Sequence, residues 1–85
     1  MEREAKQRFL KKIAINGFSI EEREQQLVLR PRGMEAVAEL VIEETEGGWK
    51  VTGASGRYAG FKRGRKKEYL ENYLNIWATQ AEAES

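Results

Sequence analysis

Residues 36–54 read AVAELVIEETEGGWKVTGA, a pattern typical of a β-hairpin. Within 36–45 the apolar residues 38, 40 and 42 alternate with residues 39, 41 and 43 and suit a buried face, which predicts a strand. The pair Gly47-Gly48 favours a tight turn because glycine accepts positive φ, and 49–54 is then predicted as the partner strand. The predicted inward face carries Ala38, Leu40, Ile42, Trp49 and Val51.

A helix is predicted on each side of this hairpin. Residues 2–15 repeat apolar side chains at three- and four-residue spacing, and Asn16-Gly17 supplies a stop because glycine adopts the left-handed conformation that ends many helices. Residues 64–82 carry a broad apolar stripe without an internal Gly or Pro, which predicts a long second helix. That stripe consists of Leu70, Tyr73, Leu74, Trp77, Ala78 and Ala81.

Residues 18–30, FSIEEREQQLVLR, allow two interpretations. Ser19 and Glu22 have the spacing of a capping box, which favours a short helix. Alternatively, pairing residue 18 with 29 and residue 20 with 27 places four apolar side chains on one face of a hairpin. We prefer the hairpin because the helix would have only a thin apolar face.

The remaining segment before the last helix is predicted as a further strand over 57–62. Six of the eight glycines lie between 47 and 64, so we expect this part of the sheet to be bent or bulged. The chain is thus predicted to form a single α+β domain over residues 1–85. Its antiparallel sheet has three to five strands, with the N-terminal and C-terminal helices packed on one face.

The composition argues against most enzyme classes. The chain contains no Cys, no His and no Asp, which removes thiolate chemistry, the usual general base and the usual transition-metal ligands. We therefore expect no catalytic residue, no cofactor and no metal. No apolar run is long enough to span a membrane, and the charged start MEREAKQRF does not resemble a secretory signal, so a cytoplasmic protein is expected.

Charge is distributed very unevenly along the chain. Residues 50–67 hold seven Lys and Arg and no acid, whereas 68–85 hold four Glu and no base. Phosphates suit such a region, because basic side chains and helix N-terminal amides attract the same anions. The sequence therefore predicts a small nucleic-acid-binding protein, for RNA or DNA, with an aromatic ring for base stacking among the contacts. The candidate residues are Arg57, Tyr58, Lys62, Arg63, Arg65, Lys66 and Lys67.

Other interpretations of the same features remain open. The basic segment could be a solvated surface paired with the Glu-rich first half, or could dock a regulatory protein on an acidic partner. Arg30 and Arg32 could extend the cationic surface. The stripe Tyr69, Tyr73 and Trp77 could be shared between subunits of a homo-oligomer. Residues 53–56, GASG, match the GXXG clamp of KH domains, although flanking strands favour a plain turn.

The run Gly60-Phe61-Lys62-Arg63-Gly64-Arg65-Lys66-Lys67 resembles one junction of double-stranded-RNA-binding domains. In that family a Gly-containing third strand leads into a Lys-rich start of the last helix, which grips phosphates. The resemblance implies that Arg65, Lys66 and Lys67 face phosphates. It extends over about 36–75. The chain departs from the family in lacking a histidine between the first two strands and in having the additional segment 18–33.

Overall fold

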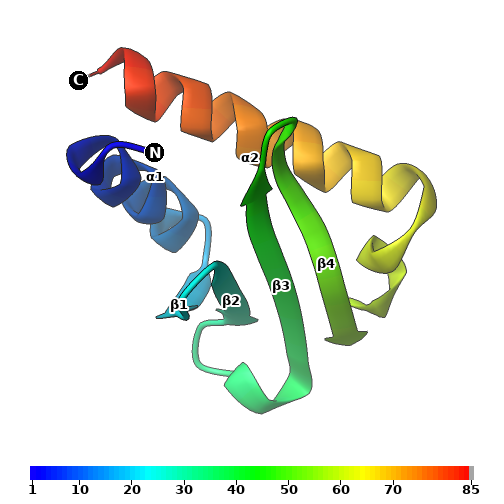
Figure 1. The fold of residues 1–85 in the computed structure, drawn as a ribbon. Coiled ribbons are helices and arrows are strands. Elements are labelled where there is room, and N and C mark those ends of the chain that lie inside the picture. The colour runs from blue at the N-terminus through cyan, green and yellow to red at the C-terminus, as the bar shows by residue number, and fades with distance from the viewer. Residues whose placement is uncertain (85) are drawn as a thin grey trace.

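The four strands form one antiparallel sheet in which spatial order follows chain order, β1-β2-β3-β4. The structure is a computed structural model, and it describes residues 1–84. One helix precedes the sheet and one follows it (Figure 1). The predicted α+β architecture is therefore confirmed, with a sheet of four strands. The elements are α1 (Arg3–Ile15), β1 (Phe18–Glu22), β2 (Gln26–Pro31), β3 (Ala38–Thr45), β4 (Gly48–Gly56) and α2 (Gly64–Ala83).

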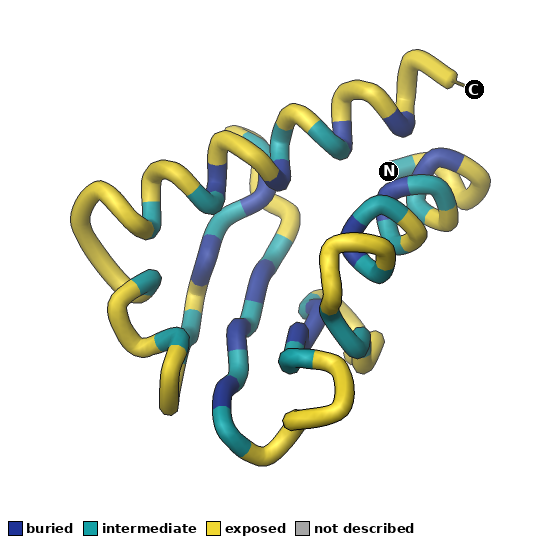
Figure 2. Tube along the Cα trace, turned by 180° about the vertical axis from the view of Figure 1, so that it is seen from behind, coloured by how far each residue is buried: buried dark blue, intermediate teal, exposed yellow. Residues whose placement is uncertain are grey.

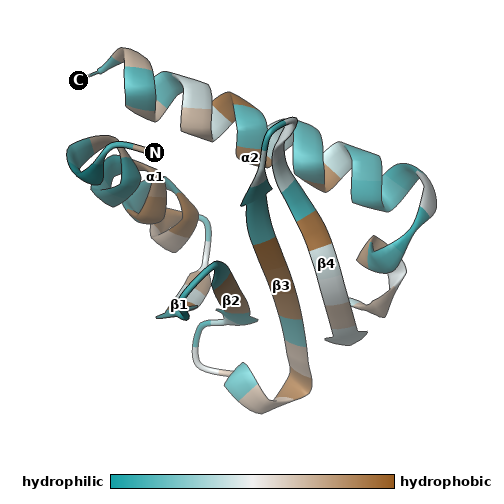
Figure 3. Cartoon of the chain, in the orientation of Figure 1, coloured by the Kyte–Doolittle hydropathy of each residue, from teal (hydrophilic) through white to brown (hydrophobic). Residues whose placement is uncertain are grey.

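Both helices bury their apolar side chains against the same face of the sheet. Phe9 and Ile13 of α1 and Leu74 of α2 belong to one core with the inward residues of β2, β3 and β4. The Phe9 and Trp49 rings lie 4.8 Å apart between their centroids, which joins α1 to β4. Figure 2 shows the buried positions alternating along β3 and the first half of β4, and Figure 3 shows that the central strands are the most hydrophobic. This alternation is the period-two pattern that predicted the central hairpin.

Residues 18–30 form the predicted hairpin, with a register two residues away from the expected one. Phe18 pairs with Pro31 and Ile20 pairs with Leu29. Arg23 and Gln26 hydrogen-bond to each other through their backbones, so the turn is centred on Glu24-Gln25 rather than on Arg23-Glu24. A shift of two residues keeps each side chain on its predicted face, because the side-chain period of a strand is two.

The bend expected from the glycine content is present as a β-bulge. The register changes between Val41, which pairs with Gly53, and Ile42, which pairs with Val51. Thr52 is therefore the additional residue on β4, and such an insertion increases local twist. Gly53 lies opposite Val41 at this bulge, and a Cβ there would lie 3.4 Å from the Val41 side chain, at ordinary contact distance.

The prediction of a strand over 57–62 is wrong. After Gly56 the chain makes consecutive turns of the i to i+3 type: Tyr58 N–H donates to Ser55 O, and Phe61 N–H donates to Tyr58 O. Ala59–Lys62 form a short 3-10 helix, η2. The physical reason is Gly56, whose φ of +60° turns the chain out of the sheet. Because side chains at i and i+3 eclipse in a 3-10 turn, Tyr58 and Phe61 share one side instead of facing opposite ways.

The free edge of β4 is closed by side chains of α2. Asn75 accepts a hydrogen bond from Trp49 N–H at 2.7 Å and donates one to Trp49 O at 3.1 Å. Glu71 accepts from Val51 N–H at 2.8 Å. An edge strand normally offers such groups to another chain, and these contacts occupy three of them in the first half of β4. Neither helix of the described residues has the length and apolar character needed to cross a membrane.

We predict that Gly56→Ala destabilises the protein more than Gly33→Ala. Both glycines have positive φ, where an L side chain costs about 1–2 kcal/mol. A Cβ at Gly56 would also lie 2.1 Å from the Val37 carbonyl oxygen, whereas a Cβ at Gly33 meets nothing within 4 Å. Both variants carry the backbone strain, and only Gly56→Ala adds the steric clash. The difference between their free energies of unfolding, measured with urea, therefore reports the clash alone. Equal losses in the free energy of unfolding would contradict this account of the turn.

Candidate functional site

Five exposed cations lie together where η2 meets α2, and we call them the basic cluster: Arg57, Lys62, Arg63, Arg65 and Lys66. Arg57 lies in the turn that leaves β4, and Lys62 ends η2. Arg63 is the N-cap of α2, and Arg65 and Lys66 belong to its first turn. In Figure 1 this segment is the yellow end of the molecule, beside β4 and away from α1. Five of the seven predicted site residues are thus brought to one exposed corner.

None of the basic cluster forms an ion pair with any residue that the structure describes. Elsewhere on the surface Lys6 pairs with Glu22 and Lys12 pairs with Glu84. The expectation that the basic segment is neutralised by the Glu-rich first half is therefore not met within residues 1–84. A cluster of unpaired cations keeps a positive potential that attracts anions.

The N-terminus of α2 adds to this potential. No side chain caps it by a hydrogen bond, and its first turn contains no acidic residue. The first N–H groups of a helix have no partner within the helix, and the helix dipole places partial positive charge there. At α1 the Glu2 carboxylate fills this role by accepting from Glu4 N–H at 2.8 Å. The N-terminus of α1 is therefore capped by a carboxylate, whereas that of α2 has no side-chain cap.

Lys66 is positioned by packing, with its charge left unpaired. Its ammonium lies 5.9 Å from the centroid of the Phe61 ring. Its aliphatic chain passes over Gly60, where a Cβ would lie 3.3 Å from Lys66 Cδ. A cation above an aromatic face is attracted by the ring quadrupole. Lys66 consequently lies over η2, and its positive charge has a defined position within the basic cluster.

Lys67 has a different role from the one predicted. Its ammonium lies 2.9 Å from the carboxylate of Glu71, which is only 7% exposed. Burial alone would raise the pKa of Glu71, but hydrogen bonds from Lys67 and from Val51 N–H outweigh it and hold the pKa below its ordinary value. Lys67 therefore neutralises a buried structural carboxylate, a role that the sequence did not predict.

Tyr58 also differs from its predicted role as an open stacking surface. Its ring is partly buried and lies 6.0 Å, between centroids, from both Phe18 and Phe61. Burial raises the pKa of its phenol. These rings fill the end of the core between the start of β1 and η2. Tyr58 anchors the turn that carries the basic cluster.

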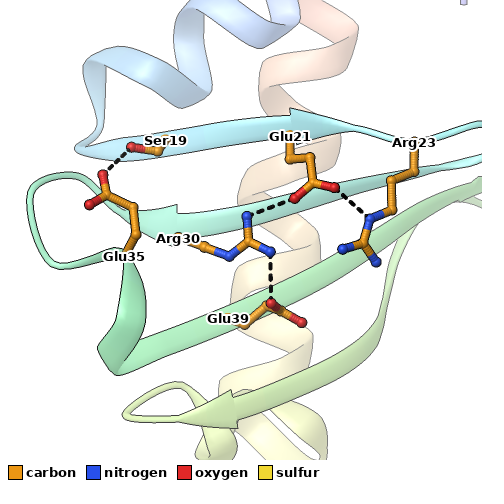
Figure 4. Close-up of polar contacts among 6 residues, drawn as sticks. All are labelled: Ser19, Glu21, Arg23, Arg30, Glu35 and Glu39. Atoms are coloured by element: carbon orange, nitrogen blue, oxygen red, sulfur yellow. Dashed lines mark hydrogen bonds and ion pairs between the residues drawn. The ribbon is translucent and has the colours of Figure 1, made fainter.

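Arg30 and Arg32 do not extend the basic cluster. Arg30 bridges Glu21 and Glu39 at 2.9 Å each, across three strands on the face of the sheet turned away from the helices (Figure 4). These contacts raise the pKa of Arg30, and hydrogen bonds from Arg23 and Arg30 lower that of Glu21. Arg32 donates to the carbonyls of Ala14 and Phe18. Arg30 and its two glutamate partners therefore satisfy one another.

The site prediction missed two exposed aromatic rings directly after the basic cluster. Tyr69 is 67% exposed and Tyr73 is 49% exposed, on the solvent side of α2. Their rings are stacked, with centroids 6.0 Å apart and planes 25° apart. The i, i+4 spacing was visible in the sequence, but which side of the helix the core occupies was not. Trp77, the third member of that stripe, is partly buried against the core.

The described residues form neither a GXXG nucleic-acid clamp nor a metal site. Residues 53–56 form the end of β4, so they do not make a GXXG loop between helices. Within residues 1–84, no group of three or more acidic side chains is arranged to hold a metal ion. The junction that resembles double-stranded-RNA-binding domains also lacks the third strand that the resemblance implied, since η2 stands in its place.

No protein-family model, curated protein or solved structure matches this chain.

We predict that Glu71→Gln lowers the free energy of unfolding at pH 7 by about 1 kcal/mol, because the charged hydrogen bond from the partly exposed Lys67 is lost. The lowered pKa of Glu71 gives stability that is fully present above the unfolded carboxyl pKa of about 4.3. It is lost as pH falls through the lower folded value. The gap between wild type and variant should therefore close in urea titrations at low pH.

The matched control is Glu68→Gln, an exposed carboxylate on the same helix without an ion pair among the described residues. It should leave the stability at pH 7 within about 0.5 kcal/mol of wild type. A Glu71→Gln deficit that persisted unchanged at low pH would show that the buried contact does not depend on the carboxylate charge.

Proposed function

We propose that this protein is a small, non-enzymatic, cytoplasmic nucleic-acid-binding protein whose basic cluster contacts the phosphate backbone. The observation that carries the proposal is the set of five exposed cations without ion-pair partners in residues 1–84, placed around an uncapped helix start. Lys and Arg that neutralise phosphates, together with helix N-terminal amides, are the usual source of sequence-independent affinity.

The structural setting supports binding more than simple solvation. Two cations outside the cluster form ion pairs within the fold: Lys67 pairs with Glu71, and Arg30 bridges Glu21 and Glu39. The backbone that carries the basic cluster packs on the core through Tyr58 and Phe61. A backbone that is already ordered loses less freedom when its side chains bind an anion. RNA and DNA both offer the phosphate spacing that such a cluster contacts.

We predict that Arg63→Ala combined with Arg65→Ala weakens binding to a labelled oligonucleotide by about tenfold or more at 50 mM salt. Each lost phosphate contact lowers the slope of log affinity against log salt by about 0.7 for a single strand, so two contacts lower it by about 1.4. Fluorescence anisotropy between 50 and 200 mM salt measures both quantities. Lys67 is left intact because its replacement would disturb Glu71.

The matched control replaces two exposed bases of α1, Arg3→Ala with Lys11→Ala, and removes the same charge from the other end of the molecule. It should change the slope little. Equal effects of the two pairs would mean that net charge, and not the basic cluster, governs binding. No binding of RNA or DNA to the wild-type protein at 50 mM salt would reject the proposal in favour of an acidic protein surface as the partner.

A further inference from the structure

A surface hollow lies directly beside the basic cluster on α2. It has a volume of about 360 Å³ and is lined by Phe61, Arg65, Lys66, Tyr69, Leu70 and Tyr73. Its walls present apolar atoms, and the charged residues that line it are both positive. This volume is at the low end of small-ligand sites, about 300–1,000 Å³, which gives room for a single flat ring system.

The rings beside this hollow are placed for stacking. Tyr69 and Tyr73 are substantially exposed, although tyrosines in a small domain have every reason to join the core. Their near-parallel arrangement, with planes 25° apart, leaves flat ring surface open to solvent along the helix. Lys66 above the Phe61 ring closes one side of the hollow. Apolar ring faces bordered by cations match a ligand that is flat, apolar and attached to an anion.

We infer that this hollow binds an unpaired nucleobase and that the protein's ligand is consequently single-stranded nucleic acid. The inference rests on the proposed function and names its ligand class. The bases of a duplex are already stacked and paired, so their faces are closed to a tyrosine, whereas a single strand offers them freely. A base stacked on Tyr69 keeps its phosphates near Arg65 and Lys66, which join the hollow to the basic cluster.

A second copy of this chain fits the hollow less well. A two-fold arrangement centred on the hollow would oppose Arg65 and Lys66 of one copy with the same residues of the other. Like charges brought together in this way oppose association. A nucleic acid supplies the opposite charge instead.

The test compares three labelled ligands of equal length by fluorescence anisotropy: a single strand, the same strand with abasic sites, and the duplex. Wild type should bind the single strand about ten- to a hundredfold more tightly than the abasic strand, as base–aromatic stacking predicts. Tyr69→Ala should lose that preference and leave binding of the abasic strand unchanged. Tyr69→Phe should restore it, because the ring and not the hydroxyl stacks.

The matched control is Ile76→Ala, a half-exposed apolar residue of α2 that does not line the hollow. It should leave all three affinities unchanged. Equal binding of single strand and abasic strand by wild type, or an unaltered preference in Tyr69→Ala, would overturn the inference. In that outcome a loss of affinity in the Arg63→Ala, Arg65→Ala variant would still uphold phosphate binding, so the two proposals fail separately.

Self-association is checked in the same samples by sedimentation. A monomer at binding concentrations is expected for wild type and for Tyr69→Ala. A wild-type dimer that becomes monomeric in Tyr69→Ala would assign the hollow to a second copy of the chain and overturn the base-binding inference.

Discussion

The arrangement of this protein depends on the hydrogen bonds that α2 makes to the open edge of β4. Asn75 bonds both the N–H and the C=O of Trp49, and Glu71 bonds the N–H of Val51. Backbone groups at a sheet edge need partners or water, and here one helix supplies them from side chains. This fixes the rotation of α2 about its axis and its position along the strand. Leu74 and Ala78 then face the core.

The fixed rotation of α2 determines which of its side chains are exposed to solvent. Once Glu71, Leu74 and Ala78 face the sheet, Tyr69 and Tyr73 are turned to solvent. The Lys67–Glu71 pair belongs to the same constraint, because a carboxylate used at a buried edge needs a cation nearby. Lys67 is thereby engaged in an ion pair, while Arg65 and Lys66, less than a turn away, have no ion-pair partner among the described residues. Two exposed cations, Arg65 and Lys66, are therefore followed directly in the chain by Lys67, whose ion pair stabilises the fold.

The region between β4 and α2 shows how local backbone geometry controls surface chemistry. Gly56 directs the chain out of the sheet at φ +60°, and the 3-10 turn that follows brings Tyr58 and Phe61 to one side. Their rings close the end of the core, and Lys66 lies over Phe61. A strand in this place would have spread the same basic residues over two faces. The compact turn gathers them at one corner, next to the aromatic hollow.

The sequence by itself determined the helices and the central hairpin, because periodicity and glycine turns are local signals. It favoured a β1–β2 hairpin over a short helix but placed its register two residues away from the observed one, and its charge runs marked the basic segment before α2. It did not determine the 3-10 turn at Ala59–Lys62, since a short segment with aromatic residues at 58 and 61 suits a strand equally well. The roles of Lys67, Tyr58 and Tyr69 were also decided only by tertiary structure. Whether a cation is paired, or a ring is open to solvent, depends on the residues packed against it from elsewhere in the chain. Glu71 reaching Val51, and Phe18 reaching Tyr58, are contacts between distant segments that no local pattern records.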